Sequence, residues 1–503
     1  MNIPLLINRL GEWNPQLFRE LQGRNKLSNL LGAVLSSLIL QILFFLLYSQ
    51  YESLDYVWRY IFCTFTIIFV FVLLFGGTYL IVSDLCKEEN TGTLNFIRLS
   101  PQSATSIFIG KMLGVPSLIY LFVIIAIPLH LVSGFLTFNV FAVFSYYLLL
   151  FACCAFFYSL AVLFSLYGKW LNGRKPWLFS SAVGLFLFIS MMLVFSSGES
   201  KFNHPGAWFR FFSPWDMIIS VLFPGFFNEN HILSIKLSFF YIPIDNNIVL
   251  LLGFFLIHYG ICTYGILQAA KRIFHNQKAT VISKKQSYLF NGFIQVMLLG
   301  LILQPEKAET DIIITGLTFI NLNLIIWLTV FILPVTQNIQ EWSRYSYQNN
   351  NQRYVKSYFK YFRKDLIWGE KSPAKLAIII NLLITTIPVI IWVTFVQENM
   401  DITSKLTALL VIAICTTWML IFTLVIQLMS LSKNLHTYMW VFGSAGMTIF
   451  LPMVSYSLHI PDIFNVFTVL FTNFAVLSLL NWQFNQQVRF LGESATKALL
   501  TGD

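Results

Sequence analysis

Residues Ile61–Val82 read IFCTFTIIFVFVLLFGGTYLIV, a stretch without a single charged side chain. A run of about 18 or more apolar residues is long enough to cross the hydrocarbon core of a bilayer as a helix. Polar and apolar residues do not alternate here, as they do in the strands of a membrane barrel. The stretch therefore predicts a membrane-spanning helix, over about residues 57–83.

Similar apolar runs recur along the whole chain. Of its 503 residues, 57% are hydrophobic and 11% are charged, whereas a soluble domain carries about 25% charged residues. So few charges exclude a soluble enzyme, a nucleic-acid-binding protein and a disordered chain. The prediction is an all-α, polytopic integral membrane helix bundle with interfacial amphipathic helices and about twelve spans: 27–48, 57–83, 104–134, 138–167, 176–196, 246–270, 288–303, 312–334, 375–396, 404–431, 437–459 and 463–482.

The basic residues divide unequally between the two sides of this predicted bundle. With the N-terminus in the cytoplasm, 26 of the 32 Lys and Arg residues fall in cytoplasmic segments and 6 on the opposite side. Basic residues concentrate on the cytoplasmic side of membrane proteins. We therefore expect a multi-pass protein of the plasma (inner) membrane with both termini in the cytoplasm. Anionic lipids of the inner leaflet would suit its inner face.

The predicted spans contain no Asp, Glu, Lys or Arg deep within them. Ion-coupled transporters usually keep such a group inside the membrane, so this class is disfavoured. His130 and His258 lie in apolar runs, and we expect each to be satisfied by a neighbouring helix or to lie close to an interface. Neither CxxC nor Cys/His spacing occurs among the six cysteines, which indicates no metal site.

Two short amphipathic helices are predicted at the inner surface. In the first, Asn14 and Pro15 suit the N-cap and the first helical position. Its apolar face comprises Leu17, Phe18 and Leu21, and its polar face Arg19, Glu20, Gln22 and Arg24. The second is predicted from apolar residues that recur at helical spacing, Val355, Tyr358, Phe359, Phe362 and Leu366. Ordinary interfacial anchoring is an equal alternative for the second helix.

A distinctive polar segment follows the second span. It reads DLCKEENTGTLNFIRLSP over Asp84–Pro101, and Gly110-Lys111 follows. Glu88 and Glu89 suit the positive end of a short helix, and Ser100-Pro101 is expected to cap the third span. Its apolar residues Leu94, Phe96, Ile97 and Leu99 are candidates for a groove on a cytosolic partner. On these grounds alone, a loop held against its own bundle is an equal alternative.

This segment resembles the first cytoplasmic loop of permease subunits of the ABC-2 type transporter family. The shared positions are Glu88, Glu89, Gly92, Thr93, Leu94, Ser100, Pro101, Gly110 and Lys111. The likeness extends in hydropathy over about residues 10–270 and is greatest to the long permeases of this type found in cyanobacteria. The family usually has Glu where this chain has Asn95, and the second half of the chain has no such loop.

The resemblance implies a site for a cytosolic ABC ATPase. Its coupling loop would comprise Glu88, Glu89, Gly92, Thr93, Leu94, Phe96, Ile97, Ser100 and Pro101. The surface helix with Asn14, Pro15, Leu17, Phe18, Arg19 and Leu21 would precede the first span. ATP and Mg would be bound by the partner and no cofactor by this chain, which lacks the Gly-x-x-x-x-Gly-Lys-Ser/Thr loop. The chain would thus be an exporter subunit rather than an enzyme, with membrane lipids and a second copy as further partners and no nucleic acid.

The chain is expected to divide into three parts. They are a permease half over 1–270, a connector with two spans and a basic amphipathic helix over 271–374, and a four-span bundle with a short tail over 375–503. A membrane-embedded lipid-modifying enzyme, a non-ABC transporter and a scaffold remain the alternatives in function. The aromatic-rich outward segment 197–245 predicts either short helices that dip into the outer leaflet or a plain interfacial belt.

Overall fold

The computed structural model describes residues 11–50, 53–168, 174–196, 200–222, 235–245, 247–304, 310–350, 364–396, 401–431, 435–457 and 462–501. These residues are helical almost throughout, with four strands of two residues each. Ten helices within this described part of the chain are long and apolar enough to cross a membrane. The predicted all-α polytopic membrane bundle is confirmed.

The chain forms two compact units. The first comprises Met1–Asn203 with Ala207–Gln277, and the second comprises His204–Gly206 with Lys278–Asp503. The predicted separation of 271–374 from 375–503 stays a prediction.

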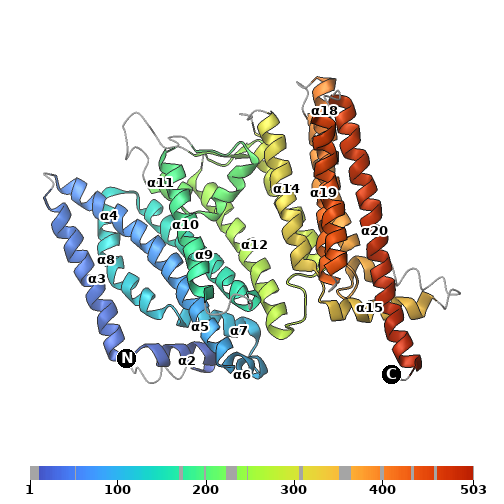
Figure 1. Ribbon diagram of the computed structural model, residues 1–503. Helices are drawn as coiled ribbons and strands as arrows, with labels where there is room; N and C mark the ends of the chain where they lie inside the picture. Colours follow the sequence, from blue (N-terminus) through green and yellow to red (C-terminus); the bar gives the residue numbers. More distant parts are fainter. Residues whose placement is uncertain are drawn as a thin grey trace. The chain divides into compact units, whose positions relative to one another are not determined.

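The first unit contains six of the ten candidate spans. Figure 1 shows α2 lying across the end of the unit at which α5, α6 and α7 meet. Its helices are α2 (Pro15–Arg24), α3 (Leu27–Tyr48), α4 (Leu54–Phe71), η1 (Val72–Gly76), α5 (Gly77–Asn90), α6 (Thr93–Leu99), α7 (Ala104–Gly114), α8 (Ser117–Thr137), α9 (Val140–Tyr167), α10 (Lys175–Ser196), most of η3 (Pro205–Phe212), α11 (Trp215–Leu222) and α12 (Ile248–His275). Strand β1 (Ser200–Lys201) pairs in parallel with β2 (Ile235–Lys236), and β3 (Ser238–Phe239) pairs antiparallel with β4 (Ile242–Pro243).

The predicted third span, 104–134, is wrong as a single helix. Helix α7 ends at Gly114, and Pro116 precedes the start of α8 at Ser117. Proline lacks an amide hydrogen and restricts the residue before it, so a helix tends to end there. Only α8 is long enough to span a membrane, and the 11 residues of α7 form a separate element.

The second span is longer than predicted. Helices α4, η1 and α5 run on without a break over Leu54–Asn90, 37 residues in all. Its π-helical turn η1 faces α9, where the Tyr158 hydroxyl donates to the Leu73 carbonyl at 2.9 Å. A Cβ atom on Gly77 would lie 2.2 Å from that hydroxyl oxygen. The wide turn and the glycine together admit Tyr158, as π-helical turns often admit a side chain.

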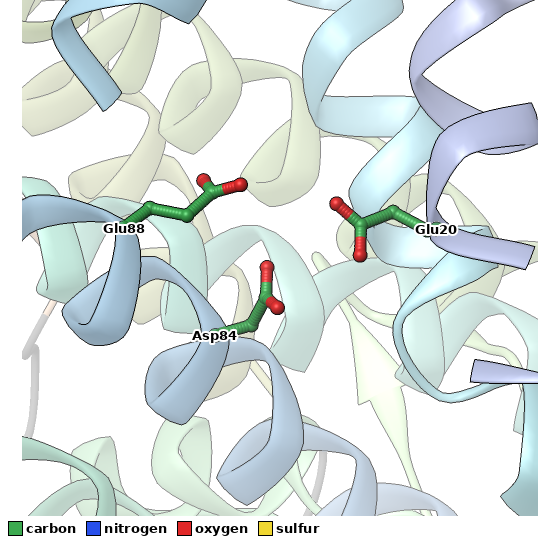
Figure 2. Close-up of side chains that lie close together, drawn as sticks. All are labelled: Glu20, Asp84 and Glu88. Carbon is green, nitrogen blue, oxygen red and sulfur yellow. The ribbon is translucent and has the colours of Figure 1, made fainter. Parts of the chain in front are cut away.

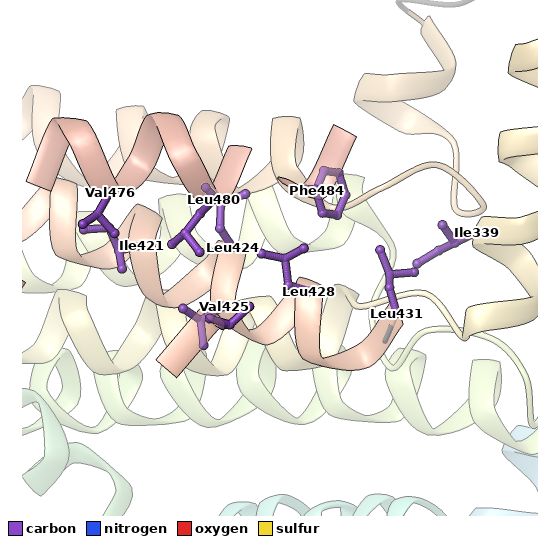
Figure 3. Packing of buried hydrophobic residues seen from close by; sticks show 10 residues of the cluster. Ile339, Ile421, Leu424, Val425, Leu428, Leu431, Val476, Leu480 and Phe484 are labelled. Atoms are coloured by element: carbon purple, nitrogen blue, oxygen red, sulfur yellow. The ribbon is translucent and has the colours of Figure 1, made fainter. Parts of the chain in front are cut away.

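The second unit is a bundle around α18 and α20. Its helices are α13 (Lys284–Ile302), α14 (Thr310–Ile332), α15 (Thr336–Asn350), α17 (Lys375–Ile391), η4 (Trp392–Val396), α18 (Ile402–Leu431), α19 (Leu435–Ser457) and α20 (Asp462–Thr501). Figure 3 shows Leu424 and Leu428 of α18 packed with Leu480 and Phe484 of α20. In Figure 1, α15 crosses the end of this bundle, as α2 crosses the end of the first unit.

Two of the twelve predicted spans are not among the ten. The seventh, 288–303, lies in the 19-residue helix α13. This helix is too polar for a candidate membrane span, because it carries residues such as Asn291 and Gln295. The eleventh, 437–459, lies in α19, where only Met439–Leu451 counts as a shorter apolar helix. Most of the predicted surface helix 355–366 lies outside the described residues. Helix α15 was not predicted from the sequence.

Candidate functional site

The first surface helix is present and begins as predicted. The Asn14 Oδ1 accepts a hydrogen bond from the Leu17 amide at 3.0 Å, and Pro15 occupies the first helical position. The Asn14 amide nitrogen also donates to the Ser106 carbonyl of α7 at 2.8 Å. One side chain therefore both starts α2 and attaches it to α7.

The predicted polar face of α2 is wrong for Glu20. This residue is buried together with Gln16 and Leu17, whereas Arg19 is exposed. The two helices approach closely because α7 presents glycines to α2. A Cβ atom on Gly110 would lie 2.8 Å from the Asn14 Oδ1, and one on Gly114 would lie 2.6 Å from the Glu20 Cβ. Glycine is therefore required at position 110 because any larger residue would separate α7 from α2.

Lys111 is the centre of a buried ion network. Its side chain is fully buried, and its Nζ lies 2.6 Å from Asp84 Oδ2, 2.8 Å from Glu88 Oε2 and 3.0 Å from Glu20 Oε1. Figure 2 shows the three carboxylates converging, Asp84 and Glu88 from α5 and Glu20 from α2. The network therefore joins α2, α5 and α7 at one point.

Two arginines complete the network. Arg19 pairs with Glu88, and with Glu20 at 3.2 Å. Arg24 pairs with Asp84, and with Glu20 at 3.4 Å. Three carboxylates thus face three cations, so the charges balance. We call these six residues the ionic clamp: Arg19, Glu20, Arg24, Asp84, Glu88 and Lys111.

The electrostatics keep the centre of the ionic clamp charged. Burial raises the pKa of Glu20, but the Lys111 ammonium and the hydrogen bonds from Lys111 and Arg19 bring it below its ordinary value of 4.5. Burial lowers the pKa of Lys111, but Asp84, Glu20 and Glu88 raise it above its ordinary value of 10.5. Both groups therefore remain ionised at neutral pH.

The ionic clamp is not arranged as a metal centre. Within the described part of the chain, the group close enough to hold a metal ion is Glu20, Asp84 and Glu88. The Lys111 ammonium already lies within 3.0 Å of an oxygen of each. It occupies the position that a cation would need, so the arrangement serves to hold three helices together.

The segment after the second span forms the short helix α6. Gly92 precedes it in the left-handed region, with φ of 76°, where residues other than glycine are strained. The Thr93 hydroxyl donates to the Glu88 carbonyl at 3.3 Å. Glu89 pairs with the buried Lys175 of α10 at 2.6 Å. The backbone turn and both glutamates are thus fixed by the protein's own residues.

The apolar residues of α6 divide between two faces. Leu94 and Ile97 are buried, at 3% and 7% exposure, so the prediction that all four apolar side chains face a partner is wrong for these two. Phe96 and Leu99 are 76% and 84% exposed. The outward face of α6 is therefore apolar, although the helix is firmly packed on its inward side.

The predicted cap of the third span is wrong. The Ser100 hydroxyl donates to the Ile97 carbonyl at 2.7 Å and so belongs to the end of α6, with Pro101 directly after it. Ser103 caps α7, because its Oγ accepts from the Ser106 amide at 3.2 Å.

A cation–π contact attaches α6 to α12. The Arg98 guanidinium lies 5.5 Å from the centre of the Phe274 ring, near the C-terminal end of α12. Phe108 of α7 contacts the same ring edge-on, with centroids 5.2 Å apart. Helix α6 is thus linked to a further candidate span of the first unit.

Several described aromatic residues of segment 197–245 pack inside the first unit. Phe202, Phe211 and Trp215 are almost completely buried, and the Trp215 indole donates to the Leu187 carbonyl of α10 at 2.8 Å. The described part of this segment therefore forms short helices, η3 and α11, packed on the spans, and its buried aromatics do not form an interfacial belt. Phe223, Phe226 and Phe227 lie outside the described residues.

His130 has partners on neighbouring helices, as expected. Its Nε2 lies 3.0 Å from the Thr66 hydroxyl and its Nδ1 lies 2.6 Å from the Tyr147 hydroxyl. His258 is buried against Phe212, with ring centroids 4.9 Å apart.

The sequence reasoning missed a line of buried polar side chains in the second unit. Asn381 of α17 donates to the Ser287 hydroxyl at 3.0 Å, and Asn291 donates to the Asn381 carbonyl at 2.8 Å. Gln295 then donates to Asn321 Oδ1 of α14 at 2.8 Å. We call this line the polar seam: Ser287, Asn291, Gln295, Asn321 and Asn381.

A lysine lies at the start of the polar seam. Lys284 is buried, and its Nζ donates to the Ser372 hydroxyl at 2.6 Å and to the carbonyls of Leu366 and Pro373 at 3.0 and 3.1 Å. Lys284, Ser287, Asn291 and Gln295 recur every three or four residues, which places them on one face of α13. This spacing is visible in the sequence and could have predicted a polar helix face. It was missed because three of the four side chains are uncharged.

The chain matches no protein-family model, no curated protein and no solved structure.

Proposed function

We propose that this multi-pass membrane protein is the permease subunit of an ABC-2 type exporter. It would move substrate across the inner membrane with ATP hydrolysed by a separate cytosolic ABC ATPase, which would bind the ATP and Mg. Both termini would lie in the cytoplasm, and the second half of the chain would either complete one pore within a single chain or form an added layer around a homodimer. The likeness of Glu88–Lys111 to the family's cytoplasmic loop supports this assignment.

The observation that carries the proposal is the two-faced helix α6. A helix fixed by the buried Leu94 and Ile97 and by the contact of Arg98 with Phe274 nevertheless exposes Phe96 and Leu99. Exposed apolar side chains on a rigid element are a common basis for protein recognition. A cytosolic ATPase would contact this face.

The ionic clamp supports a mechanical role for the same region. It ties α2 and α7 to α5, and α5 is continuous with α4 as far as Leu54. A displacement of α6 by the partner would therefore move α2, α5 and α7 together, rather than bend one loop. The continuous helix Leu54–Asn90 would carry that displacement across the membrane, as in rigid-body switching.

The proposal is tested with Phe96→Arg combined with Leu99→Arg in the full chain. We expect normal membrane insertion but loss of the co-purifying ATPase and of substrate-stimulated ATP hydrolysis. Leu54→Arg is the matched control, because Leu54 is apolar and similarly exposed but lies at the far end of the continuous helix Leu54–Asn90, which precedes α6. Leu94→Arg is unsuitable as a probe, since Leu94 is buried in its own unit.

Two results would count against the proposal. Unchanged coupling in the double variant would move the contact away from α6. The absence of any ATP-hydrolysing subunit after gentle extraction of the wild-type protein would overturn the ABC assignment itself.

A further inference from the structure

A cavity of about 290 Å³ lies within the second unit, between α15, the start of α17 and α20. Its walls are apolar except for Lys375 and Asn485. The other lining residues are Trp342, Leu366, Pro373, Leu376, Ile379, Phe484 and Val488. The volume of the cavity is close to the lower end of the range for small-molecule sites. Such sites are mostly apolar and contain a few precisely placed polar groups.

The walls of the cavity are fixed by the rest of the unit. The buried Lys284 holds the carbonyls of Leu366 and Pro373, which both line the cavity. On another side, Phe484 belongs to the hydrophobic cluster of Figure 3. The cavity is therefore preformed, because both the polar and the apolar cores of the unit support it.

The cavity carries positive charge without a matching carboxylate. The Lys375 ammonium donates to Asn481 Oδ1, and among the described residues no carboxylate pairs with it. Its neighbour Lys371, by contrast, pairs with Glu341 at 2.6 Å. The sequence over 351–364 is also basic, with Arg353, Lys356, Lys360, Arg363 and Lys364 and no acidic residue, and Asp365 follows it.

The place of the cavity along the helices indicates what binds there. Lys375 is the first residue of a candidate membrane span, and Ile379 lies one turn further in. The charged end of the cavity is therefore at the membrane boundary and its apolar walls extend inward. Juxtamembrane basic residues attract anionic lipid headgroups with about 1 kcal/mol each.

We propose that this cavity binds one acidic phospholipid, with the lipid phosphate at Lys375 and an acyl chain against Ile379 and Val488. A soluble anion would leave the apolar walls uncovered, and a neutral lipid would leave Lys375 without a counter-ion. Nothing in the proposed transport function requires this site, so the two proposals stand or fall separately.

The test is native mass spectrometry of the purified full chain in micelles that contain phosphatidylglycerol or phosphatidylcholine at equal concentration. We expect the wild-type protein to retain one phosphatidylglycerol in preference to phosphatidylcholine. Lys375→Gln should weaken phosphatidylglycerol binding about fivefold and leave phosphatidylcholine unaffected. Lys371→Gln is the matched control and should change neither, because Glu341 already neutralises that lysine. Equal retention by the wild type and Lys375→Gln would overturn the proposal.

A second variant tests the apolar part of the site. Ile379→Trp should fill the cavity and abolish retention of the bound lipid, and Val488→Phe does the same with a smaller change if the tryptophan variant does not fold. Retention of phosphatidylglycerol by a folded cavity-filling variant would overturn the proposal. So would displacement of the lipid by millimolar glycerol 3-phosphate, which indicates a soluble phosphate ligand. A change in oligomer mass without a change in bound lipid would show instead that a second copy covers the cavity.

Discussion

The two units hold their polar residues in opposite ways. In the first unit, three carboxylates and three cations form the ionic clamp at the end of α5, beside the surface helix α2. In the second unit, the polar seam runs along α13 through neutral amides and hydroxyls, and Lys284 lies at its start. Asn321 and Asn381 of the polar seam belong to candidate membrane spans, whereas the ionic clamp lies on α2, α7 and the end of α5. A charge deep in a membrane costs far more than an amide that is hydrogen-bonded to a neighbour, which accounts for neutral groups in the seam.

The largest effect is expected from Lys111→Met. This change removes the central cation and leaves the buried Glu20 and the half-buried Asp84 and Glu88 with only Arg19 and Arg24 as counter-ions, which should lower the free energy of unfolding by about 3–5 kcal/mol. Thermal unfolding in detergent measures the loss. Lys87→Met is the control, because Lys87 is exposed on the same helix as Asp84 and Glu88. An equal, small effect of both changes would mean that the ionic clamp does not stabilise the first unit.

Gly77→Ala should have the next largest effect. The added methyl group would meet the Tyr158 hydroxyl at 2.2 Å, and overpacking of this kind costs about 1–3 kcal/mol. Gly253→Ala has open space around the new methyl group and should be neutral or slightly stabilising. Comparable melting temperatures for the two variants would contradict the role assigned to the close approach of Tyr158.

Asn381→Leu should have a moderate effect on the second unit. It removes two donated hydrogen bonds, to Ser287 and to Ala377, and membrane hydrogen bonds average well below 2 kcal/mol each. We expect a loss of about 1–2 kcal/mol, measured by the same unfolding assay. Asn323→Leu serves as the control because Asn323 is exposed on α14 and donates to the Phe319 carbonyl of its own helix. A loss as large as that of Lys111→Met would remove the distinction between clamp and seam.

The smallest effect is expected from acidification. Because the pKa of Glu20 in the folded protein is below its ordinary value of 4.5, the unfolded chain binds this proton more readily than the native state does. The stability from Glu20 is therefore present above about pH 4.5 and decreases as the pH falls through the folded pKa. Unfolding midpoints measured against pH should show a shallower decline for Glu20→Gln, and the effect of Asn381→Leu should not change with pH. An identical acid decline in Glu20→Gln would assign it to other groups.

Much of the fold was predictable because its signals are local. Ten of the twelve spans predicted from long apolar runs correspond to candidate spans of the structure, and Asn14-Pro15 correctly marked the start of α2. Errors arose where one residue changes a helix within an apolar run. Pro116 splits the predicted third span, and Ser103 rather than Ser100 caps α7. These errors concern boundaries, which depend on the balance between a few competing backbone contacts.

The candidate site was predictable only in part. The sequence singled out Glu88, Glu89 and Lys111 as members of one motif, but it could not show that all three pair within the protein. Helical periodicity also placed Glu20 on a solvent face, because it takes no account of a lysine on another helix. Burial of Glu20 depends on Lys111, which lies 91 positions away in the sequence and 3.0 Å away in space.

The sequence by itself determined that this protein is a multi-pass helical membrane protein, because burial in lipid requires long apolar helices wherever they later pack. Only the tertiary structure decided which polar side chains meet. It brought Glu20, Asp84 and Glu88 to Lys111, turned Leu94 and Ile97 inward while leaving Phe96 and Leu99 outside, and aligned the polar seam. The physical reason is that hydropathy is a property of each segment, whereas the pairing of a charge or an amide depends on geometry between segments far apart in the chain.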